Sequence, residues 1–375
     1  MKNSIPLLMP VVVLTVSAAA GLFGQEESHP TLAIGSRAPD FRLKGIDGRL
    51  HRLKEYSRSK ILVLIFTTNH CPTAQAYEER IMKLDEDYRP RGVKVVCISS
   101  NNPEALRLDE MGYTDVGDSF DDMKLRAEEK GFSFPYLYDG DDQSAARAYG
   151  PVSTPHVFIF DAERKLQYAG RVDDSERAKK VTVSDARNAI DAMLAGRLVP
   201  VPQTKTFGCS IKWAYKRKSA ADALKQWAAE PVGLETAAAD DIRALIANDT
   251  EKLLLLNVYA TWCGPCRTEF PELVRINRMY RNREFFFATL SADGPDNREK
   301  AAEFLRKNEA SAKNLLFNSD NKYALIEAVD PEWQGGLPYT LLIRPGGEVI
   351  YRHMGEIDPL DLKRAIVGVL GRVYP

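Results

Sequence analysis

Two segments of the chain follow one pattern, in which an apolar strand ends at a cysteine and a helix begins directly after it. The first is IFTTNHCPTAQAYEER, residues 65–80, and the second is VYATWCGPCRTEF, residues 258–270. A helix that starts at a cysteine offers free N–H groups and the positive end of its dipole to a thiolate. The chain has 375 residues, which is enough for about two domains, and the pattern predicts one such turn in each.

The other predicted elements repeat in the same order around these turns. Each unit reads as strand, cysteine turn, helix and strand, followed later by a β-hairpin and a closing helix. In the first unit we expect helices near 74–89 and 183–196 and strands near 61–66, 92–100, 153–161 and 165–174. In the second unit we expect helices near 240–248, 298–307 and 359–371 and strands near 252–260, 284–292 and within 336–355. The predicted fold class is α/β: two domains in tandem, each with a central mixed β-sheet flanked by helices.

The N-terminal residues have the composition of an export signal. Lys2 precedes an apolar stretch, residues 5–20, and SAAAG offers an A-x-A cleavage site near Ala20. We therefore expect residues 1–24 to be a signal peptide and the protein to be extracytoplasmic, either periplasmic or secreted. The alternative is an uncleaved N-terminal membrane anchor. A formal net charge of −1 gives no global field that attracts nucleic acid, so no nucleic-acid partner is expected.

The five cysteines of the chain indicate redox use more than structural cross-linking. An odd number in an exported protein leaves at least one thiol free or intermolecular. Cys263 and Cys266 form a C-x-x-C pair, in which Cys263 can attack a disulfide and Cys266, one turn further, can resolve the mixed disulfide. A zinc site would need two more ligands, and the sequence has neither a second C-x-x-C nor a histidine pair nearby. No metal and no other cofactor is expected.

The motif WCGPC resembles the redox site of thioredoxins of the TlpA/ResA type, over residues 235–375. The resemblance implies that Cys263 and Cys266 are catalytic and that Pro338, in GLPYT, is a cis-proline that helps to bind an extended substrate. Four residues are implied to bind the substrate: Trp262, Gly264, Pro265 and Pro338. The Gly-Pro pair between the cysteines resembles that of reducing thioredoxins, which favours a disulfide reductase over an oxidase.

An acidic residue of the same motif is a candidate proton carrier. Glu269 matches the acidic position of the TlpA/ResA pattern C-x-x-C-x-x-E-x-P. Asn257 stands where cytoplasmic thioredoxins carry an aspartate, and an amide cannot act as an acid or a base. Glu269 is therefore expected to move protons to or from the thiols.

The first unit resembles the peroxiredoxin-like redoxins of the AhpC/TSA type through GSRAPDF, TNHCPT and TPHVFIFD. The pattern T-x-x-C-P-T implies that Cys71 is the peroxidatic cysteine, whose thiolate attacks peroxide to give a sulfenic acid. It also implies that Thr68 places a hydroxyl near the peroxide. Peroxiredoxins carry an arginine near FIFD, whereas the matching place here holds Pro155, which is expected to be a substrate-binding cis-proline. This departure argues against fast peroxidase chemistry.

A group of exported peroxiredoxin-like redoxins is similar to this unit in AYGPVSTP, GRVDD and GCSIKW. Thr68 and Ser153 stand where that group carries cysteines. The similarity implies that Cys209 is a resolving partner for Cys71 and reaches it from a flexible extended segment. The alternatives are that Cys71 is an inert buried thiol in a binding fold, and that Cys209 stays free or pairs structurally.

Two further residues are expected to have no part in the chemistry. Cys97 lies within the strand VKVVCISS and is predicted to pack in the core. His156 follows the predicted cis-proline and is interpreted as a surface histidine.

These features predict four parts: a signal peptide (1–24), an AhpC/TSA-like redoxin domain (33–197), a linker with Cys209 (198–234) and a thioredoxin domain (235–375). The leading hypothesis is an exported thiol–disulfide oxidoreductase, a disulfide reductase with a possible peroxide-reactive site at Cys71. Its partners would be disulfide-containing exported proteins or peroxide, and the resemblance implies a membrane electron donor of the DsbD/CcdA type. One alternative is a thiol peroxidase with antioxidant activity, in which the second domain reduces the first. The other is a first domain that is only a docking module.

Overall fold

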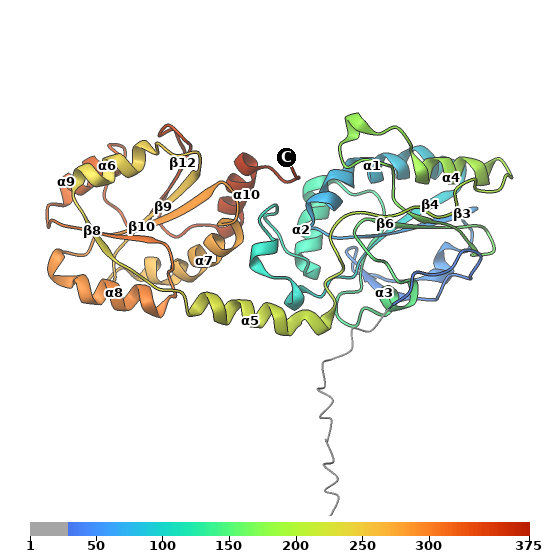
Figure 1. Ribbon diagram of the computed structural model, residues 1–375, viewed down its shortest axis with the longest axis horizontal. Helices are drawn as coiled ribbons and strands as arrows, with labels where there is room; N and C mark the ends of the chain where they lie inside the picture. The colour runs from blue at the N-terminus through green and yellow to red at the C-terminus, as the bar shows by residue number, and fades with distance from the viewer. Residues whose placement is uncertain (1–28) are drawn as a thin grey trace, which may run out of the picture.

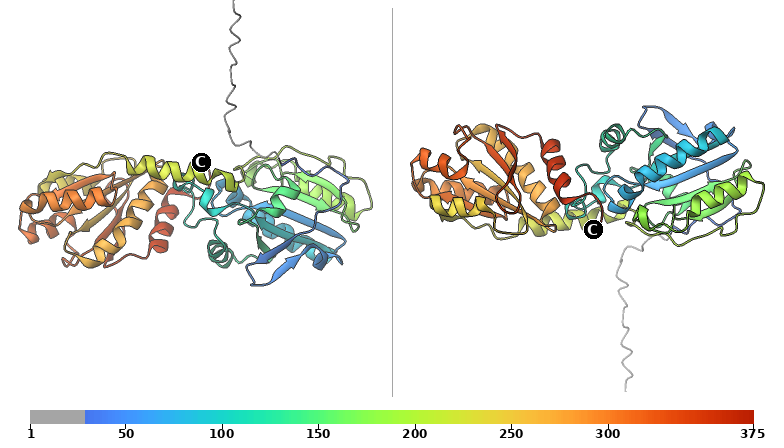
Figure 2. Two further views of the ribbon diagram at one scale, coloured as in Figure 1. Left: turned by 90° about the horizontal axis from the view of Figure 1, so that it is seen from below. Right: turned by 90° about the horizontal axis from the view of Figure 1, so that it is seen from above.

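The computed structural model describes residues 29–375, and the predicted signal peptide lies outside the described residues. The chain forms two α/β lobes, which helix α5 (Arg217–Ala228) joins along one side (Figure 1). Two further views show the same pair of lobes lying end to end (Figure 2). The prediction of two α/β domains in tandem is confirmed. Within residues 29–375, no helix has the length and apolar character needed to cross a membrane.

The first domain is built on a seven-stranded sheet in the order β2-β1-β5-β4-β3-β6-β7. Its strands are β1 (Arg42–Gly45), β2 (Leu50–Arg52), β3 (Ile61–Thr67), β4 (Val93–Ser99), β5 (Tyr136–Tyr138), β6 (His156–Phe160) and β7 (Leu166–Gly170). Its helices are α1 (Pro72–Tyr88), α2 (Phe120–Lys130), α3 (Ser144–Tyr149) and α4 (Asp185–Leu194). Strand β3 runs parallel to β4 and antiparallel to β6, so the sheet is mixed, as predicted.

The second domain repeats this plan on a six-stranded sheet in the order β13-β12-β9-β10-β11-β8. Its strands are β8 (Glu235–Ala237), β9 (Leu253–Tyr259), β10 (Phe285–Ser291), β11 (Lys313–Phe317), β12 (Tyr339–Ile343) and β13 (Val349–Met354). Its helices are α6 (Ala239–Ala247), α7 (Gly264–Tyr280), α8 (Arg298–Lys307), α9 (Lys322–Val329) and α10 (Pro359–Leu370). Strand β9 corresponds to β3, and α7 corresponds to α1.

The central strands are apolar except for Thr67 and Asn257, because both faces of each sheet are covered. Every residue of β3 (ILVLIFT) and of β9 (LLLLNVY) is buried. The two cysteine turns therefore start from the most rigid part of each domain. This places Cys71 and Cys263 at equivalent positions, where a central strand ends and a long helix begins.

The two domains are in contact through the C-terminal half of α7. Leu108, in the turn η4 (Leu108–Glu110), shares one apolar cluster with Ile276 and Met279 of α7. The hydroxyl of Tyr280 donates a hydrogen bond to the carbonyl oxygen of Thr114 at 2.7 Å. The interface thus joins the segment between β4 and α2 of the first domain to one end of α7.

The segment that follows α4 packs as extended chain on the first domain. Gln203 forms a bridge with Ala169 of β7, and Cys209 forms an antiparallel bridge with Thr154. Ile211 is buried in the first domain. Cys209 therefore arrives on an extended segment, and backbone pairing joins this segment to the first domain; its flexibility remains a prediction. The boundary after residue 197 remains a prediction.

Candidate active sites

In the second domain, Cys263 is the residue that caps the N-terminus of helix α7. Its Sγ accepts a hydrogen bond from the backbone N–H of Cys266 at 3.3 Å. The two cysteines form a disulfide, with their Cα atoms 5.3 Å apart. When the pair is reduced, a thiolate at Cys263 is favoured by the free N–H groups and the dipole of the helix.

The residue that precedes Cys263 is exposed to solvent, whereas the two cysteines are buried. The side chain of Trp262 is 67% exposed, whereas Cys263 is only 6% exposed and Cys266 is fully buried. Pro265 lies in the first turn of α7, where its missing N–H costs nothing. The peptide bond between Leu337 and Pro338 is cis, as predicted.

Glu269 lies on the same helix, one turn after Cys266, and is buried. Its Oε1 accepts a hydrogen bond from Nδ2 of Asn257 at 2.8 Å, and its Oε2 accepts one from the N–H of Ile357 at 2.9 Å. Burial raises the pKa of Glu269 more than these two hydrogen bonds lower it. A carboxyl group with a raised pKa, held rigidly inside the domain, is suited to carry a proton near the thiol pair.

In the first domain, Cys71 caps α1 as Cys263 caps α7, and its sulfur is fully buried. The Sγ accepts hydrogen bonds from the N–H groups of Ala74 and Cys209, both at 3.4 Å. Burial by itself raises the pKa of Cys71. The hydrogen bond with the Cys209 thiol, the charge of His70 and the two N–H groups outweigh this effect and lower the pKa to about 6. At neutral pH the thiolate therefore predominates.

A buried ion pair stands next to Cys71. Nδ1 of His70 lies 2.6 Å from Oδ2 of Asp118, and both side chains are almost completely buried. Oδ1 of Asp118 accepts the N–H groups of Asn69 and His70, and Oδ2 also accepts a hydrogen bond from Asn101. Burial lowers the pKa of His70, but the Asp118 carboxylate raises it more. The resulting imidazolium stabilises the Cys71 thiolate.

Sequence analysis located Cys71 but did not find the partners of the neighbouring His70. Asp118 is 48 residues away and Asn101 is 31 residues away in the chain. Neither belongs to a motif, so no local signal pointed to them. Thr68, predicted to act near the peroxide, accepts a hydrogen bond from Nδ2 of Asn101 at 2.9 Å and is buried. The polar network therefore includes Thr68 as well as the ion pair.

The chain's own backbone occupies the position beside the cis-proline of the first domain. The peptide bond between Thr154 and Pro155 is cis, as predicted. The N–H of Thr154 donates to the carbonyl oxygen of Cys209 at 2.9 Å. Gly208, with φ +129°, passes so close that a Cβ would lie 2.1 Å from the carbonyl oxygen of Thr154. Within residues 29–375, no isolated bridge of this kind involves Leu337, which precedes the cis-proline of the second domain.

Of the two residues predicted to have no chemical role, Cys97 lies where it was expected and His156 does not. Cys97 is fully buried in the core, as expected. The prediction of a surface position for His156 is wrong, since its side chain is 3% exposed and packs on Phe158 with ring centroids 4.4 Å apart. Burial lowers the pKa of His156 to about 4, so it is neutral at physiological pH.

In the described part of the chain, no three His, Cys, Asp or Glu side chains are grouped in a way that could hold a metal ion.

The two cysteine sites lie at different distances from the domain interface. Gln75, one turn after Cys71, donates to the carbonyl oxygen of Tyr113, whose ring is 5.0 Å from that of Tyr374 of the second domain. Cys263 lies at the opposite end of α7 from the interface contact of Tyr280, and a 17-residue helix is about 25 Å long. Direct exchange between Cys263 and Cys71 of one molecule would therefore require the domains to separate.

Comparison with known proteins finds two family models that match separate parts of the chain. Residues 34–169 match the AhpC/TSA family, and residues 222–366 match the Redoxin family. Thiol-disulfide oxidoreductase ResA of Geobacillus thermodenitrificans is 29% identical over 171 residues, which cover 44% of this chain and 88% of that protein. Thioredoxin-1 of Saccharomyces cerevisiae is 30% identical over 95 residues, which cover 25% of this chain and 82% of that protein.

Solved structures are also similar to the chain. An uncharacterized conserved protein from Geobacillus kaustophilus is 40% identical, with a TM-score of 0.43, and the match covers 48% of this chain and 92% of that protein. A hypothetical protein from Sinorhizobium meliloti 1021 is 36% identical, with a TM-score of 0.44, and the match covers 49% of this chain and 97% of that protein.

Proposed function

The chain belongs to the thioredoxin-like thiol–disulfide oxidoreductases, with an AhpC/TSA domain before a redoxin domain, and from this premise we propose that its second domain reduces protein disulfides. The observation that carries the proposal is the Cys263–Cys266 pair at the N-terminus of α7, beside an exposed Trp262 and a cis-proline. The proposed site of action is outside the cytoplasm, which is supported by the signal-like composition of residues 1–24.

The proposed reaction transfers two electrons from the reduced cysteine pair to a substrate disulfide. The Cys263 thiolate attacks one substrate sulfur, which forms a mixed disulfide and releases the other substrate sulfur as a thiolate. Cys266 then loses its proton and attacks Sγ of Cys263, which forms the Cys263–Cys266 disulfide and releases the second substrate thiol. An external dithiol donor, for which a membrane carrier of the DsbD/CcdA type is proposed, returns the pair to the reduced form.

Glu269 is proposed to accept the proton that Cys266 loses. Its position one turn from Cys266 and its raised pKa support this role. The variant Glu269→Gln replaces one carboxylate oxygen by an NH₂ group, which cannot accept a hydrogen bond. Because each oxygen accepts one hydrogen bond, one of the two donors, Asn257 or Ile357, then loses its acceptor.

Trapping of mixed disulfides tests the proposed function. The variant Cys266→Ser, in the full-length chain, cannot resolve the intermediate, so disulfide-linked complexes through Cys263 should accumulate with exported proteins. The double variant Cys263→Ser/Cys266→Ser is the control and should trap none. Equal trapping by both variants, or no reduction of a model disulfide protein by the reduced wild-type chain, would contradict the proposal.

A second candidate activity, reduction of a peroxide at Cys71, is favoured by the neighbouring thiol of Cys209. The Cys71 thiolate would attack a peroxide oxygen, which breaks the O–O bond, forms a sulfenic acid and releases an alcohol or water after protonation. The Cys209 thiol would then attack the oxidised sulfur, which forms a disulfide and releases water. The full burial of Cys71 supports a small substrate in place of a protein. An external dithiol would have to reduce the new disulfide.

Rapid mixing of the reduced protein with hydrogen peroxide separates this activity from the alternatives. The variant Cys263→Ser/Cys266→Ser leaves Cys71, Cys97 and Cys209 as the only thiols, so the product can be assigned by peptide mass spectrometry. A fast reaction that ends in a Cys71–Cys209 disulfide would support the peroxidase. A rate equal to that of free cysteine would favour a docking module. Turnover that requires Cys266 in the same molecule would favour reduction of the first domain by the second.

A further inference from the structure

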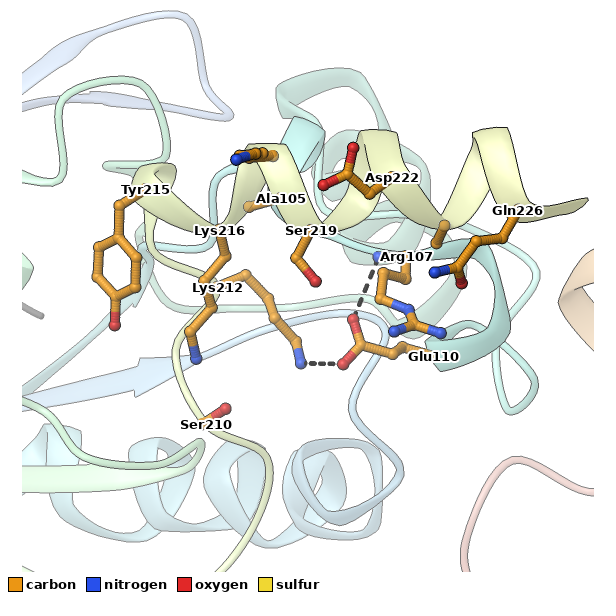
Figure 3. Close-up of a pocket in the computed structure, with 12 residues that line it drawn as sticks. Ala105, Arg107, Glu110, Ser210, Lys212, Tyr215, Lys216, Ser219, Asp222 and Gln226 are labelled. Carbon is orange, nitrogen blue, oxygen red and sulfur yellow. Dashed lines mark hydrogen bonds and ion pairs between the residues drawn. The ribbon is translucent and has the colours of Figure 1, made fainter. Parts of the chain in front are cut away.

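A cavity of about 680 Å³ lies on the far side of the segment that carries Cys209, away from Cys71. Its walls come from the loop before α2, from residues 210–216 and from the first turns of α5 (Figure 3). A volume of this size suits a small-molecule ligand. None of the residues proposed to act in either cysteine site lines this cavity.

The walls of the cavity carry an excess of positive charge. Four basic and two acidic side chains line it, although the whole chain has a formal net charge of −1. The basic ones are Arg107, Lys212, Lys216 and Lys218, and the acidic ones are Glu110 and Asp222. The local field therefore favours an anionic ligand.

Two of these cations have no counter-charge. Nζ of Lys212 is paired with Oε1 of Glu110 at 2.5 Å. Within the described residues, neither Lys216 nor Lys218 has a carboxylate close enough for an ion pair, and Lys216 is half-buried. Nζ of Lys216 lies 5.9 Å from the centroid of the Tyr215 ring, which does not neutralise its charge, and a bound anion would.

The extended backbone directs the polar side chains into the cavity. Successive side chains of an extended segment point to opposite faces. Cys209 and Ile211 face Cys71 and the core, so Ser210 and Lys212 face the cavity. Figure 3 shows the amino groups of Lys212 and Lys216 extending to the same side, toward the hydroxyl group of Ser210.

We propose that this cavity binds a small molecule with an oxyanion group, a phosphate or a carboxylate, between Lys212, Lys216 and Ser210. Lysine ammonium groups and a serine hydroxyl all donate hydrogen bonds, which oxyanions accept. In this structure, Nζ of Lys212 donates a hydrogen bond to Glu110. A bound oxyanion would accept another hydrogen bond from the same ammonium group.

Binding in the cavity would also steady the segment that lies over Cys71. The N–H of Lys212 donates to Oδ1 of Asn101, and its carbonyl oxygen accepts the N–H of Asn102, both at 2.8 Å. Asn101 in turn binds Asp118 at 2.8 Å. A ligand that binds only when the segment is in place shifts the equilibrium against its release. Alkylation of Cys209 should then slow by about tenfold when the ligand is at ten times its dissociation constant.

Calorimetric titration of the full-length protein with inorganic phosphate and, separately, with succinate tests the proposal. Binding of either anion supports the site, and the anion that binds identifies the group it prefers. Lys216→Met should weaken binding by about tenfold, whereas Lys205→Met, which changes an exposed lysine of the same segment outside the cavity, should not.

Two results would overturn the proposal. One is the absence of binding heat from both anions at millimolar concentration, and the other is an equal affinity in wild type and Lys216→Met. Ser210→Ala is a second test variant, since removing one exposed hydroxyl group leaves the fold intact. Because these titrations do not depend on electron transfer, failure of the proposed reductase activity would leave their interpretation unchanged.

Discussion

The two cysteine turns have the same backbone plan and different surroundings. In both, a fully buried central strand ends at a cysteine that caps a long helix, and a cis-proline from a later strand lies beside it. In the first domain, residues 208–210 of the chain itself fill the space at the cis-proline, and Cys71 is fully buried. In the second domain, Trp262, the residue before Cys263, is 67% exposed.

Under the two proposed activities, this difference would let one fold serve two kinds of substrate. A site that is open beside its cis-proline can receive an extended polypeptide, whereas a site covered by its own chain admits only small molecules. The electrostatic source of thiolate stability also differs. Cys71 has a buried histidine–aspartate pair next to it as well as the N–H groups of a helix start, whereas the Cys263 thiolate is favoured by the N–H groups and the dipole of α7.

The largest expected effect tests whether the two sites act independently. Cys263→Ser should lower the rate of protein disulfide reduction by more than about a thousandfold, because it removes the attacking sulfur. Cys71→Ser should leave that rate unchanged. Both are measured as reduction of a model disulfide protein by the pre-reduced variant. A large loss in Cys71→Ser would show that the two sites are coupled and would break the comparison.

Asp118→Asn should change the pKa of the cysteine in the first site. Without the aspartate charge, His70 becomes neutral near pH 7, and the pKa of Cys71 should rise from about 6 toward the ordinary value for a thiol. The thiolate fraction at pH 7 would then fall, while the hydrogen bonds from Cys209 and Ala74 would keep the pKa below the free-thiol value. The measurement is the pH dependence of Cys71 alkylation by iodoacetamide. An unchanged profile would rule out the ion pair as the source of the low pKa.

The same variant changes the pH dependence of stability. The pKa of Asp118 is lower in the folded protein than in the unfolded chain. Its contribution to the free energy of unfolding is therefore present above about pH 4 and is lost as the pH falls through the pKa of the folded state. The pKa of His70 is higher in the folded protein than in the unfolded chain. Its contribution to the free energy of unfolding is therefore complete below about pH 6.5 and is lost as the pH rises through the pKa of the folded state. The difference in unfolding free energy between wild type and Asp118→Asn, from denaturant titration, should be largest between these limits, at about 3–5 kcal/mol. A difference that does not change with pH would contradict this assignment.

Gly208→Ala should make the first site resemble the second. The new Cβ would collide with the carbonyl oxygen of Thr154, and φ +129° is unfavourable for alanine. Displacement of the segment should speed the alkylation of Cys71 and Cys209 by about tenfold, which corresponds to strain of 1–3 kcal/mol. Gly196→Ala is the matched control, since it also has a positive φ but no atom within 4 Å of the new Cβ. Equal rates in the two variants would show that the segment does not control access.

Trp262→Ala should have the smallest effect. Its side chain is 67% exposed, so stability should change by less than about 0.5 kcal/mol. If Trp262 contacts the substrate, KM for a protein disulfide should rise several-fold while kcat changes little. Peroxide oxidation of Cys71 in the same variant should be unaffected. A change in the peroxide reaction would indicate a connection between the sites that the structure does not show.

Much of the first domain's chemistry was hidden from sequence reasoning because it depends on distant residues. The T-x-x-C-P-T motif located Cys71, and the later GCSIKW motif suggested Cys209. Nothing in the neighbourhood of Asp118 marks it as the partner of His70, because strand β4 and the loop before α2 bring it there. The wrong placement of His156 has a similar cause. A histidine that begins a strand is buried or exposed according to what covers the sheet.

The sequence by itself determined the local features. Apolar runs marked the central strands and the cysteine–proline turns marked the helix starts, because each depends on residues that are neighbours in the chain. The cis peptide bonds at Pro155 and Pro338 were implied by the family resemblance. Only the tertiary structure decided what surrounds these turns: the His70–Asp118 pair, the segment across Thr154, and the separation of Cys263 from the domain interface. These depend on which distant segments the folded sheets bring together, and a periodic sequence pattern does not contain that information.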